Sequence, residues 1–219
     1  MSLSAVIFDL DGVLIDSETV WGSVREQVTR ESGGRWHDRA QQEMMGMSSQ
    51  EWSRYMHDAL GMPMEPADIS ALVVERLRER YEQGVPLLPH AVETVRALAQ
   101  HWPLGLASSS NRPLIDLVLE LTGLASSFRV TVSSEEVGRG KPAPDVYLEA
   151  ARRLDALPAT CAAIEDATNG IRSAKAAGMT VVVVPRPDFP PAPDALDMAD
   201  VVVNSLADLP FRAEQQQCR

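Results

Sequence analysis

The sequence predicts an α/β protein whose core is a doubly wound parallel sheet, with a helical module inserted after the first strand. Two observations predict this class. Beyond residue 90, short apolar runs alternate with segments of helical pattern, which is the order of a parallel sheet covered by helices on both faces. Between residues 17 and 83, helix-forming sequence continues without a strand-like run. The chain of 219 residues is long enough for such a core with a smaller insert.

The first strand is expected at Ala5–Phe8, an apolar run that ends abruptly in Asp9 and Asp11. Such a run is typical of a buried strand in a parallel sheet. Ligands of these sheets lie just outside the carboxyl ends of the strands, so both carboxylates are candidates for chemistry, with a solvated turn as the alternative. A calcium loop is excluded, because the sixth and twelfth positions counted from Asp9 are Leu14 and Val20.

Two helices are expected in the inserted module, within residues 20–33 and 69–84. Each of these segments closes at a glycine, as helices often do. The stretch GVPLLP at residues 84–89 then indicates a linker that returns to the core.

The remaining elements alternate along the rest of the chain. The expected helices are 91–101, 113–121, 144–154 and 169–177, and the expected strands are 104–108, 128–133, 161–164, 180–184 and 201–203. A proline-rich loop is expected at 185–193 and a frayed tail at 213–219.

Composition and charge narrow the function classes. A formal net charge of -11 argues against nucleic acid or an anionic membrane surface as partner. No apolar run approaches the length of a membrane helix, and the chain enters its first strand without a cleavable leader. The two cysteines, Cys161 and Cys218, give no disulfide framework. We therefore expect a cytoplasmic protein.

Short polar side chains follow the strand expected at 104–108. Ser108, Ser109, Ser110 and Asn111 stand directly before the next helix. Hydroxyl groups and free backbone N–H groups at a helix N-terminus form a ready anion site. Simple capping of that helix is the alternative.

Lys141 lies in the segment EVGRGKPAPD, between a glycine and a proline. A nucleotide P-loop is excluded, because Glu135 holds the place of its first glycine and Pro142 follows the lysine. An exposed lysine is the default, but Pro142 and Pro144 stiffen the loop and reduce the entropy lost when the side chain points inward.

Glu165 and Asp166 repeat the pattern of an apolar strand that ends in acidic residues. If the strands are parallel, these side chains meet Asp9 and Asp11 at one edge of the sheet. Two carboxylates about 4 Å apart repel by roughly 4 kcal/mol at an effective dielectric near 20, so the group requires a cation. Oxygen ligands beside a phosphate favour Mg²⁺.

These segments, in this order, resemble the haloacid dehalogenase-like hydrolase superfamily over nearly the whole chain. The motifs that carry the resemblance are FDLDGVLIDSE, the serine of LASSS, the lysine of GKPAPD, and EDATNG followed by IRSAKAAGM. Within the superfamily the chain is similar to the β-phosphoglucomutase and sugar-phosphate phosphatase group, including 2-deoxyglucose-6-phosphate and hexitol-phosphate phosphatases. The resemblance implies a Rossmann-like core at 1–16 and 85–219, and an α-helical cap domain at 17–84.

The resemblance also implies roles for the two aspartates of the first motif. Asp9 would be the nucleophile that forms an aspartyl-phosphate. Asp11 would protonate the leaving oxygen and then accept a proton from water.

The other motifs would bind the phosphoryl group and the metal. Ser108, Ser109 and Lys141 would hold the phosphoryl oxygens. The ligands that the resemblance implies for Mg²⁺ are Asp9, Asp11 through its backbone carbonyl, and Asp166, with Glu165 joining directly or through water.

Two positions depart from the mutases that the chain resembles. Trp21 and Ser49 stand where those enzymes have a histidine and an arginine that orient the sugar phosphate. Water is therefore the expected acceptor. On the substrate side we expect Glu18, Trp21, Met47 and Asn111, with local packing or a solvated surface as the alternative for each.

The resulting prediction is a Mg²⁺-dependent phosphatase, a phosphoric monoester hydrolase acting on a small phosphorylated metabolite such as a sugar or polyol phosphate. The expected enzyme is a monomer. The alternatives are a sugar phosphate mutase, and a non-catalytic regulatory or binding protein on the same fold.

Overall fold

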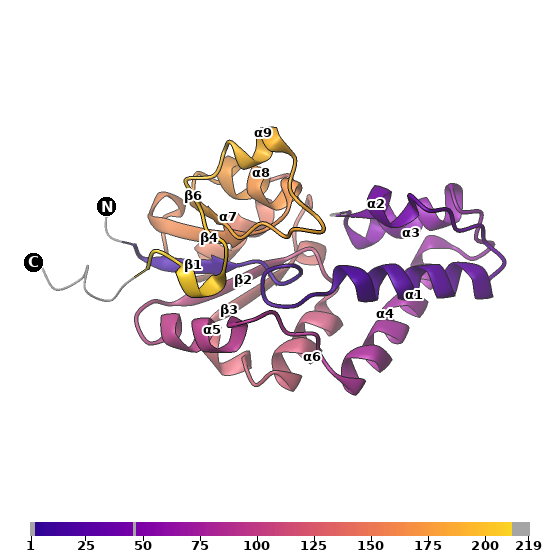
Figure 1. Ribbon diagram of the computed structural model, residues 1–219, viewed down its shortest axis with the longest axis horizontal. Helices are drawn as coiled ribbons and strands as arrows, with labels where there is room; N and C mark the ends of the chain where they lie inside the picture. Colours follow the sequence, from indigo (N-terminus) through magenta and orange to yellow (C-terminus); the bar gives the residue numbers. More distant parts are fainter. Residues whose placement is uncertain (1–2, 46, 212–219) are drawn as a thin grey trace, which may run out of the picture.

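The computed structural model describes residues 3–45 and 47–211, and its centre is a six-stranded parallel sheet (Figure 1). The order of the strands is β3-β2-β1-β4-β5-β6. The strands are β1 (Ala5–Phe8), β2 (Leu104–Ser108), β3 (Val130–Ser133), β4 (Cys161–Glu165), β5 (Thr180–Val183) and β6 (Val201–Val202).

The chain winds outward from β1 in both directions, first through β2 and β3 and then through β4, β5 and β6. The order therefore reverses between β1 and β4, where Phe8 pairs with Ile164. Sheets of this kind bind ligands outside the carboxyl ends of the strands at such a reversal. The fold thus marks the ends of β1 and β4 as the place for a site.

Both faces of the sheet are buried, which explains the continuous apolar runs of its strands. Val6 and Phe8 of β1 belong to the hydrophobic core on one face, and Ala5 and Ile7 to the core on the other. Helices α5 (Ala91–Ala99) and α6 (Arg112–Leu121) cover the first face, and α7 (Asp145–Arg153), α8 (Thr168–Ala176) and α9 (Pro193–Leu196) cover the second (Figure 1).

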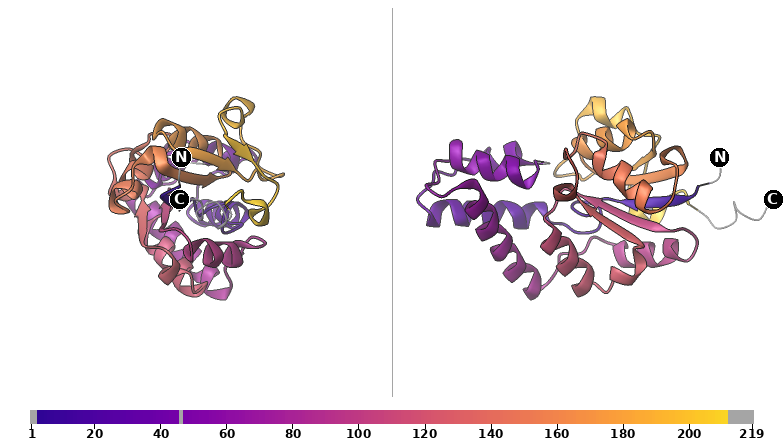
Figure 2. Two further views of the ribbon diagram at one scale, coloured as in Figure 1. Left: turned by 90° about the vertical axis from the view of Figure 1, so that its left-hand side faces the viewer. Right: turned by 180° about the vertical axis from the view of Figure 1, so that it is seen from behind.

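Four helices between β1 and α5 form a separate layer, which we call the helical insertion. They are α1 (Glu18–Glu31), α2 (Ala40–Met44), α3 (Ser49–Asp58) and α4 (Pro66–Gln83). Figures 1 and 2 show this insertion beyond the end of the sheet rather than over either face. Helix α4 also contacts α6, so the insertion rests against the core.

The predicted fold class is confirmed, and several boundaries are corrected. Helices α5 and α7 are shorter than expected, α6 and α8 begin one residue earlier, and β3 begins at Val130 because Phe128 turns into the opposite core. Strand β4 gains Glu165, whereas β5 and β6 each end one residue earlier. Helices α2, α3 and α9 were not predicted, nor were the 3₁₀ turns Ala125–Ser127, Ser134–Glu136, Pro158–Thr160 and Leu206–Asp208.

Three remaining observations concern the cysteines, the C-terminal tail and the hydropathy of the helices. The tail expected at 213–219, with Cys218, lies outside the described residues. Cys161 is a free, buried thiol. Within the described ranges, no helix combines the length and the hydropathy that a membrane crossing requires.

Candidate active site

The structure brings Asp9, Glu165 and Asp166 together where the strand order reverses. The amide N–H of Asp9 donates to the Ile164 carbonyl oxygen over 3.0 Å, which ties the end of β1 to the end of β4. One carboxylate oxygen from each of the three acids lies within 4.8 Å of the other two, and all three residues are buried. The arrangement is a compact, water-poor cluster of negative charge.

Lys141 supplies a cation within this cluster. Its ammonium donates to Oδ1 of Asp9 over 2.7 Å and to Oε1 of Glu165 over 2.6 Å. The side chain is only 5% exposed. Lys141 therefore points inward, and the alternative of an ordinary surface lysine is excluded.

Tyr147 of α7 supports the cluster from the side of that helix. Its hydroxyl donates to Oε1 of Glu165 over 2.6 Å, and its ring lies 4.9 Å from the Lys141 ammonium. The hydroxyl and the ammonium together fix one oxygen of Glu165. Tyr147 was not predicted, because a tyrosine on the buried face of a helix has the sequence pattern of a core residue.

Two glycines make room for the acids. A Cβ at Gly12 would lie 1.9 Å from Oδ2 of Asp166, and the backbone there has a φ of +81°. A Cβ at Gly170 would lie 2.0 Å from Oε1 of Glu165. Both acids thus pack directly against backbone, which only glycine allows at these distances.

Burial and mutual repulsion change the proton affinities of the cluster. Burial raises the pKa of Asp9 to about 8; the Lys141 ammonium opposes this change, while Glu165 and Asp11 add to it. Burial, followed by Glu165 and Asp9, holds the pKa of Asp166 well above its usual range. Burial alone would lower the pKa of Lys141, but Asp9 and Glu165 outweigh it and raise that pKa. Asp9 therefore needs additional positive charge to be ionised near neutral pH.

Asp11 forms hydrogen bonds with the start of the helical insertion and with the loop after β2. Its Oδ1 accepts from the Ser17 hydroxyl over 2.6 Å and from the Trp21 indole N–H over 3.3 Å. Its Oδ2 accepts from the Ser110 hydroxyl over 2.6 Å and, at 3.4 Å, from that of Ser108. Among the described residues, its side chain is not part of the acidic cluster.

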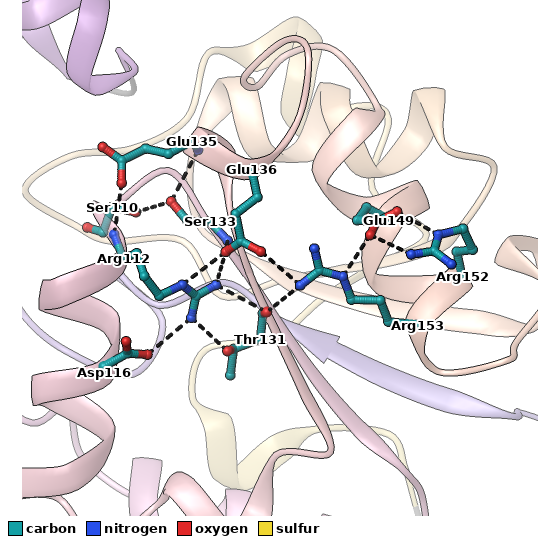
Figure 3. Close-up of polar contacts among 10 residues, drawn as sticks. All are labelled: Ser110, Arg112, Asp116, Thr131, Ser133, Glu135, Glu136, Glu149, Arg152 and Arg153. Atoms are coloured by element: carbon teal, nitrogen blue, oxygen red, sulfur yellow. Dashed lines mark hydrogen bonds and ion pairs between the residues drawn. The ribbon is translucent and has the colours of Figure 1, made fainter.

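A polar network behind Ser110 connects this loop to the edge strand β3 and to the 3₁₀ turn that follows it (Figure 3). Ser133 donates from its hydroxyl to the Ser110 carbonyl oxygen over 2.7 Å and accepts from the amide of Glu135. Glu136 accepts from the Ser133 amide over 3.0 Å and from the Arg112 guanidinium. The network fixes the backbone that presents Ser110 to Asp11.

Asn111 and Ser49 meet at the carboxylate of Glu135. The Asn111 amide donates to Oε1 over 2.7 Å, and the Ser49 hydroxyl, from helix α3, donates to the same oxygen over 3.1 Å. A cavity lies beside the acidic cluster, and Asn111 is not among the described residues that line it. Its side chain instead joins a contact between core and insertion.

A cavity of about 710 Å³ lies between the acidic cluster and the helical insertion. Three of the predicted substrate residues, Glu18, Trp21 and Met47, line it together with Asp9 and Lys141. Ser109 lines it as well, whereas Ser108 is fully buried behind the loop.

Several lining residues were not predicted. Among these are Arg25, Gln41 and Trp52 of the insertion, whereas Ser110 of the core, which also lines the cavity, belongs to the polar segment that the sequence indicated as an anion site. Arg25 lies four positions after Trp21, which places both on one face of α1 and was the signal available in the sequence. Gln41 and Trp52 come from the two helices that the sequence pattern did not show.

Fold and site together define a doubly wound α/β protein with a helical insertion over a buried acidic cluster that includes Lys141. The chain belongs to the haloacid dehalogenase-like hydrolase family, whose sequence profile matches residues 6–184. The resemblance stated from the motifs is thereby confirmed.

Individual relatives agree with this assignment. Hexitol phosphatase B of Escherichia coli (strain K12) is 33% identical over 224 residues, covering 94% of this chain and 93% of that protein. The bifunctional riboflavin kinase/FMN phosphatase of Arabidopsis thaliana is 33% identical over 208 residues and 94% of this chain. The match covers 54% of that protein, so the chain spans about half of its length. The predicted class, a phosphoric monoester hydrolase, agrees with both names.

A solved structure shows the same architecture. CbbY from Rhodobacter sphaeroides, crystallised in complex with phosphate, superimposes with a TM-score of 0.83 at 26% identity. The superposition covers 95% of this chain and 96% of that one. The similarity therefore includes the helical insertion as well as the sheet.

Proposed function

We propose that this protein is a Mg²⁺-dependent phosphatase that hydrolyses a small phosphorylated metabolite through a covalent phosphoryl group on Asp9. The observation that carries the proposal is the charge balance of the buried site. Asp9, Glu165 and Asp166 lie together in a low-dielectric environment, and Lys141 is the cation placed among them. Such a site is suited to a divalent cation and to a phosphoryl group that this cation and the lysine both attract.

The residues present fit Mg²⁺. Carboxylate oxygens are the ligands this ion prefers, and Asp9 and Asp166 can each offer one. Oδ1 of Asp166 is buried, and none of the described residues donates a hydrogen bond to it. A buried carboxylate oxygen without a partner is costly unless a ligand completes it. When bound, Mg²⁺ would supply the charge that keeps Asp9 ionised and stabilises the phosphoryl oxygens.

Asp9 and Asp11 have different roles in the proposed reaction, Asp9 as the nucleophile and Asp11 as the proton donor and acceptor. The Asp9 carboxylate attacks phosphorus, a P–O bond forms, and the bond from phosphorus to the leaving oxygen breaks. Asp11 donates its proton to that oxygen. In the second step Asp11 takes a proton from water as the water oxygen attacks phosphorus, which releases phosphate and restores Asp9. Asp11 lines the same cavity as Asp9 but lies outside the acidic cluster of the described residues, which supports a separate role for it.

Lys141 and the loop after β2 hold the phosphoryl group. The ammonium is fixed by Asp9 and Glu165, so it loses little freedom when it meets a phosphoryl oxygen. Ser109 faces the cavity, and the buried Ser108 accepts from the Ser110 amide over 3.0 Å, which shapes the loop.

We further propose that residues 17–84 act as a cap over a core made of 1–16 and 85–219. Bulk water is then excluded while the ester bond breaks.

The names of the relatives, a hexitol phosphatase and an FMN phosphatase, support a sugar or polyol phosphate as substrate. Trp21 and Ser49 stand where the mutases that the chain resembles have a histidine and an arginine, which supports water as the acceptor. We assign the protein to the cytoplasm, consistent with the free thiol of Cys161.

The test is phosphate release by the purified protein with Mg²⁺ across sugar, polyol, glycolate and nucleotide phosphates. Asp9→Asn should lower release at least about 10³-fold, because the nucleophile is removed. Asp116→Asn, which changes an exposed carboxylate on α6, is the matched control. Hydrolysis by Asp9→Asn at the wild-type rate would contradict the mechanism. Conversion of glucose 1-phosphate to glucose 6-phosphate faster than phosphate release would favour a mutase instead.

A further inference from the structure

Arg25 is a buried cation on the insertion side of the cavity. It lies on α1, is 5% exposed, and lines the cavity opposite the acidic cluster. Its guanidinium carbon lies 4.4 Å from the ring centroid of Trp21 and 5.0 Å from that of Trp52. Contacts of a guanidinium with two indole rings hold it in a defined orientation.

The hydrogen-bonding capacity of Arg25 is largely unused. A guanidinium carries five N–H donors, yet among the described residues it donates only to Oε1 of Gln41, over a long 3.4 Å. Its Nε is buried without a partner in the part of the chain that the structure describes. Burial lowers the pKa of Arg25 to about 10, which still leaves it charged near neutral pH. A buried cation with free donors beside a cavity is the pattern of a ligand contact that is still missing.

Gln41 connects Arg25 to an acceptor. Its amide nitrogen donates to Oε2 of Glu18 over 2.9 Å, while its amide oxygen faces Arg25. Glu18, Gln41 and Arg25 therefore present an acceptor, an amide and a donor along one wall of the cavity. We call these three residues the cap polar row.

The charges around the cap polar row favour a neutral ligand. A second phosphate or a carboxylate at Arg25 would also meet Glu18, Asp11 and Asp38, which line the same cavity. Like charges brought close together in the cavity repel each other. A hydroxyl group can accept from Arg25 and donate to Glu18 without this repulsion.

We propose that the cap polar row of Glu18, Gln41 and Arg25 is the specificity subsite for a neutral, polyhydroxylated leaving group, and that it discriminates against esters with a second anionic group. The inference rests on the proposed phosphatase function and names its substrate class. The phosphoryl end would bind at Asp9 and Lys141, and adjacent hydroxyls of the leaving group would bridge Arg25 and Glu18.

The experiment compares kcat/KM for sorbitol 6-phosphate with that for p-nitrophenyl phosphate, whose leaving group has no hydroxyls. Arg25→Met should lower kcat/KM for sorbitol 6-phosphate at least about tenfold more than for p-nitrophenyl phosphate, because a lost hydrogen bond to a charged group raises the barrier for that substrate alone. Arg30→Met, at an exposed arginine on the same helix, should keep the wild-type ratio.

Glu18→Gln provides a second variant at a half-buried position, should Arg25→Met fold poorly. It removes the repelling charge, so kcat/KM for fructose 1,6-bisphosphate relative to sorbitol 6-phosphate should rise about tenfold. The inference alone would be overturned if Arg25→Met lowered kcat/KM equally for both substrates. It would also be overturned if Glu18→Gln kept the wild-type ratio of kcat/KM for the bisphosphate to that for sorbitol 6-phosphate. Failure of the wild type to hydrolyse even p-nitrophenyl phosphate would contradict the proposed function, and this inference with it.

Discussion

The ammonium of Lys141 lies 2.7 Å from the carboxylate of Asp9, although the two residues are 132 positions apart in the chain. The contact joins the loop after β1 to the loop before α7. Both side chains are buried, so the pair is held in a low-dielectric environment in which charge interactions are strong. It fixes the nucleophile that we propose and places a cation beside it.

Replacing Lys141 tests this relationship first. Lys141→Met should lower phosphate release about 10²- to 10³-fold, because a preorganised cation is lost. In metal-free protein it should also lower the free energy of unfolding by roughly 3–5 kcal/mol, since the carboxylates lose their counter-ion. Lys175→Met, which breaks a more exposed pair with Asp200, is the control for losing a lysine. Urea unfolding and a phosphate assay measure both effects; wild-type values for Lys141→Met would exclude the role.

Gly12→Ala tests whether Asp166 must pack against backbone. The new Cβ would lie 1.9 Å from Oδ2 of Asp166, so the carboxylate has to move and Mg²⁺ affinity should fall at least about tenfold. Gly33→Ala is the matched control, because Gly33 has nearly the same backbone, with a φ of +80°, and a Cβ there would meet nothing within 4 Å. Both variants carry the left-handed strain of roughly 1–2 kcal/mol. Calorimetric titration with Mg²⁺ should therefore separate them, and equal affinities would refute the packing argument.

Tyr147→Phe removes the hydroxyl that donates to Glu165. The expected loss in the free energy of unfolding is roughly 1.5–3 kcal/mol, because a hydrogen bond to a buried charged group disappears. Tyr55→Phe removes a hydroxyl that donates over the same 2.6 Å to Glu43 near the surface, where the loss should stay within about 0.5 kcal/mol. If chemical denaturation gives equal losses, burial is not what makes the Tyr147 contact strong.

The thermal stability of the metal-free protein should depend on pH, and so should the stabilisation that Mg²⁺ provides. The pKa of Asp9 is raised to about 8 in the folded protein, so the folded state holds its proton more tightly than the unfolded chain. Stability of the metal-free protein therefore falls as pH rises from about 4 to about 8. Mg²⁺ binds the ionised carboxylate, so the gain in Tm on adding Mg²⁺ should be larger at about pH 8 than at about pH 5.5. Scanning calorimetry with and without Mg²⁺ checks this, and a gain independent of pH would contradict it.

The sequence predicts those parts of the site whose signal is local. Asp9 directly follows an apolar run, and Asp166 follows another after Glu165. In a parallel sheet such positions share one edge. Lys141 follows from its stiff, proline-bounded loop together with the family resemblance. For the two aspartates the end of a strand sets the position of the side chain, and for the lysine the stiff loop does.

The sequence does not predict contacts that depend on tertiary packing. Arg25 and Tyr147 lie on helix faces that have the pattern of ordinary core positions, and their partners are far away in the chain. Asn111 was expected on the substrate side, but its amide donates a hydrogen bond to the carboxylate of Glu135. Helix α2 was missed because it has only 5 residues, and such elements are stabilised by their neighbours rather than by their own sequence. Helix α3 has 10 residues and begins with a capping box between Ser48 and Glu51, so a local signal for it was present in the sequence.

The most direct test of the account is to look for the phosphoryl group on Asp9 itself. Rapid acid quenching of the Mg²⁺-loaded enzyme with ³²P-labelled sorbitol 6-phosphate should leave label on the protein, releasable by hydroxylamine as expected of an acyl phosphate. Peptide mapping should place it on Asp9, and Asp9→Asn should carry none. Turnover of the same substrate without protein-bound label, or label on another residue, would contradict the covalent mechanism.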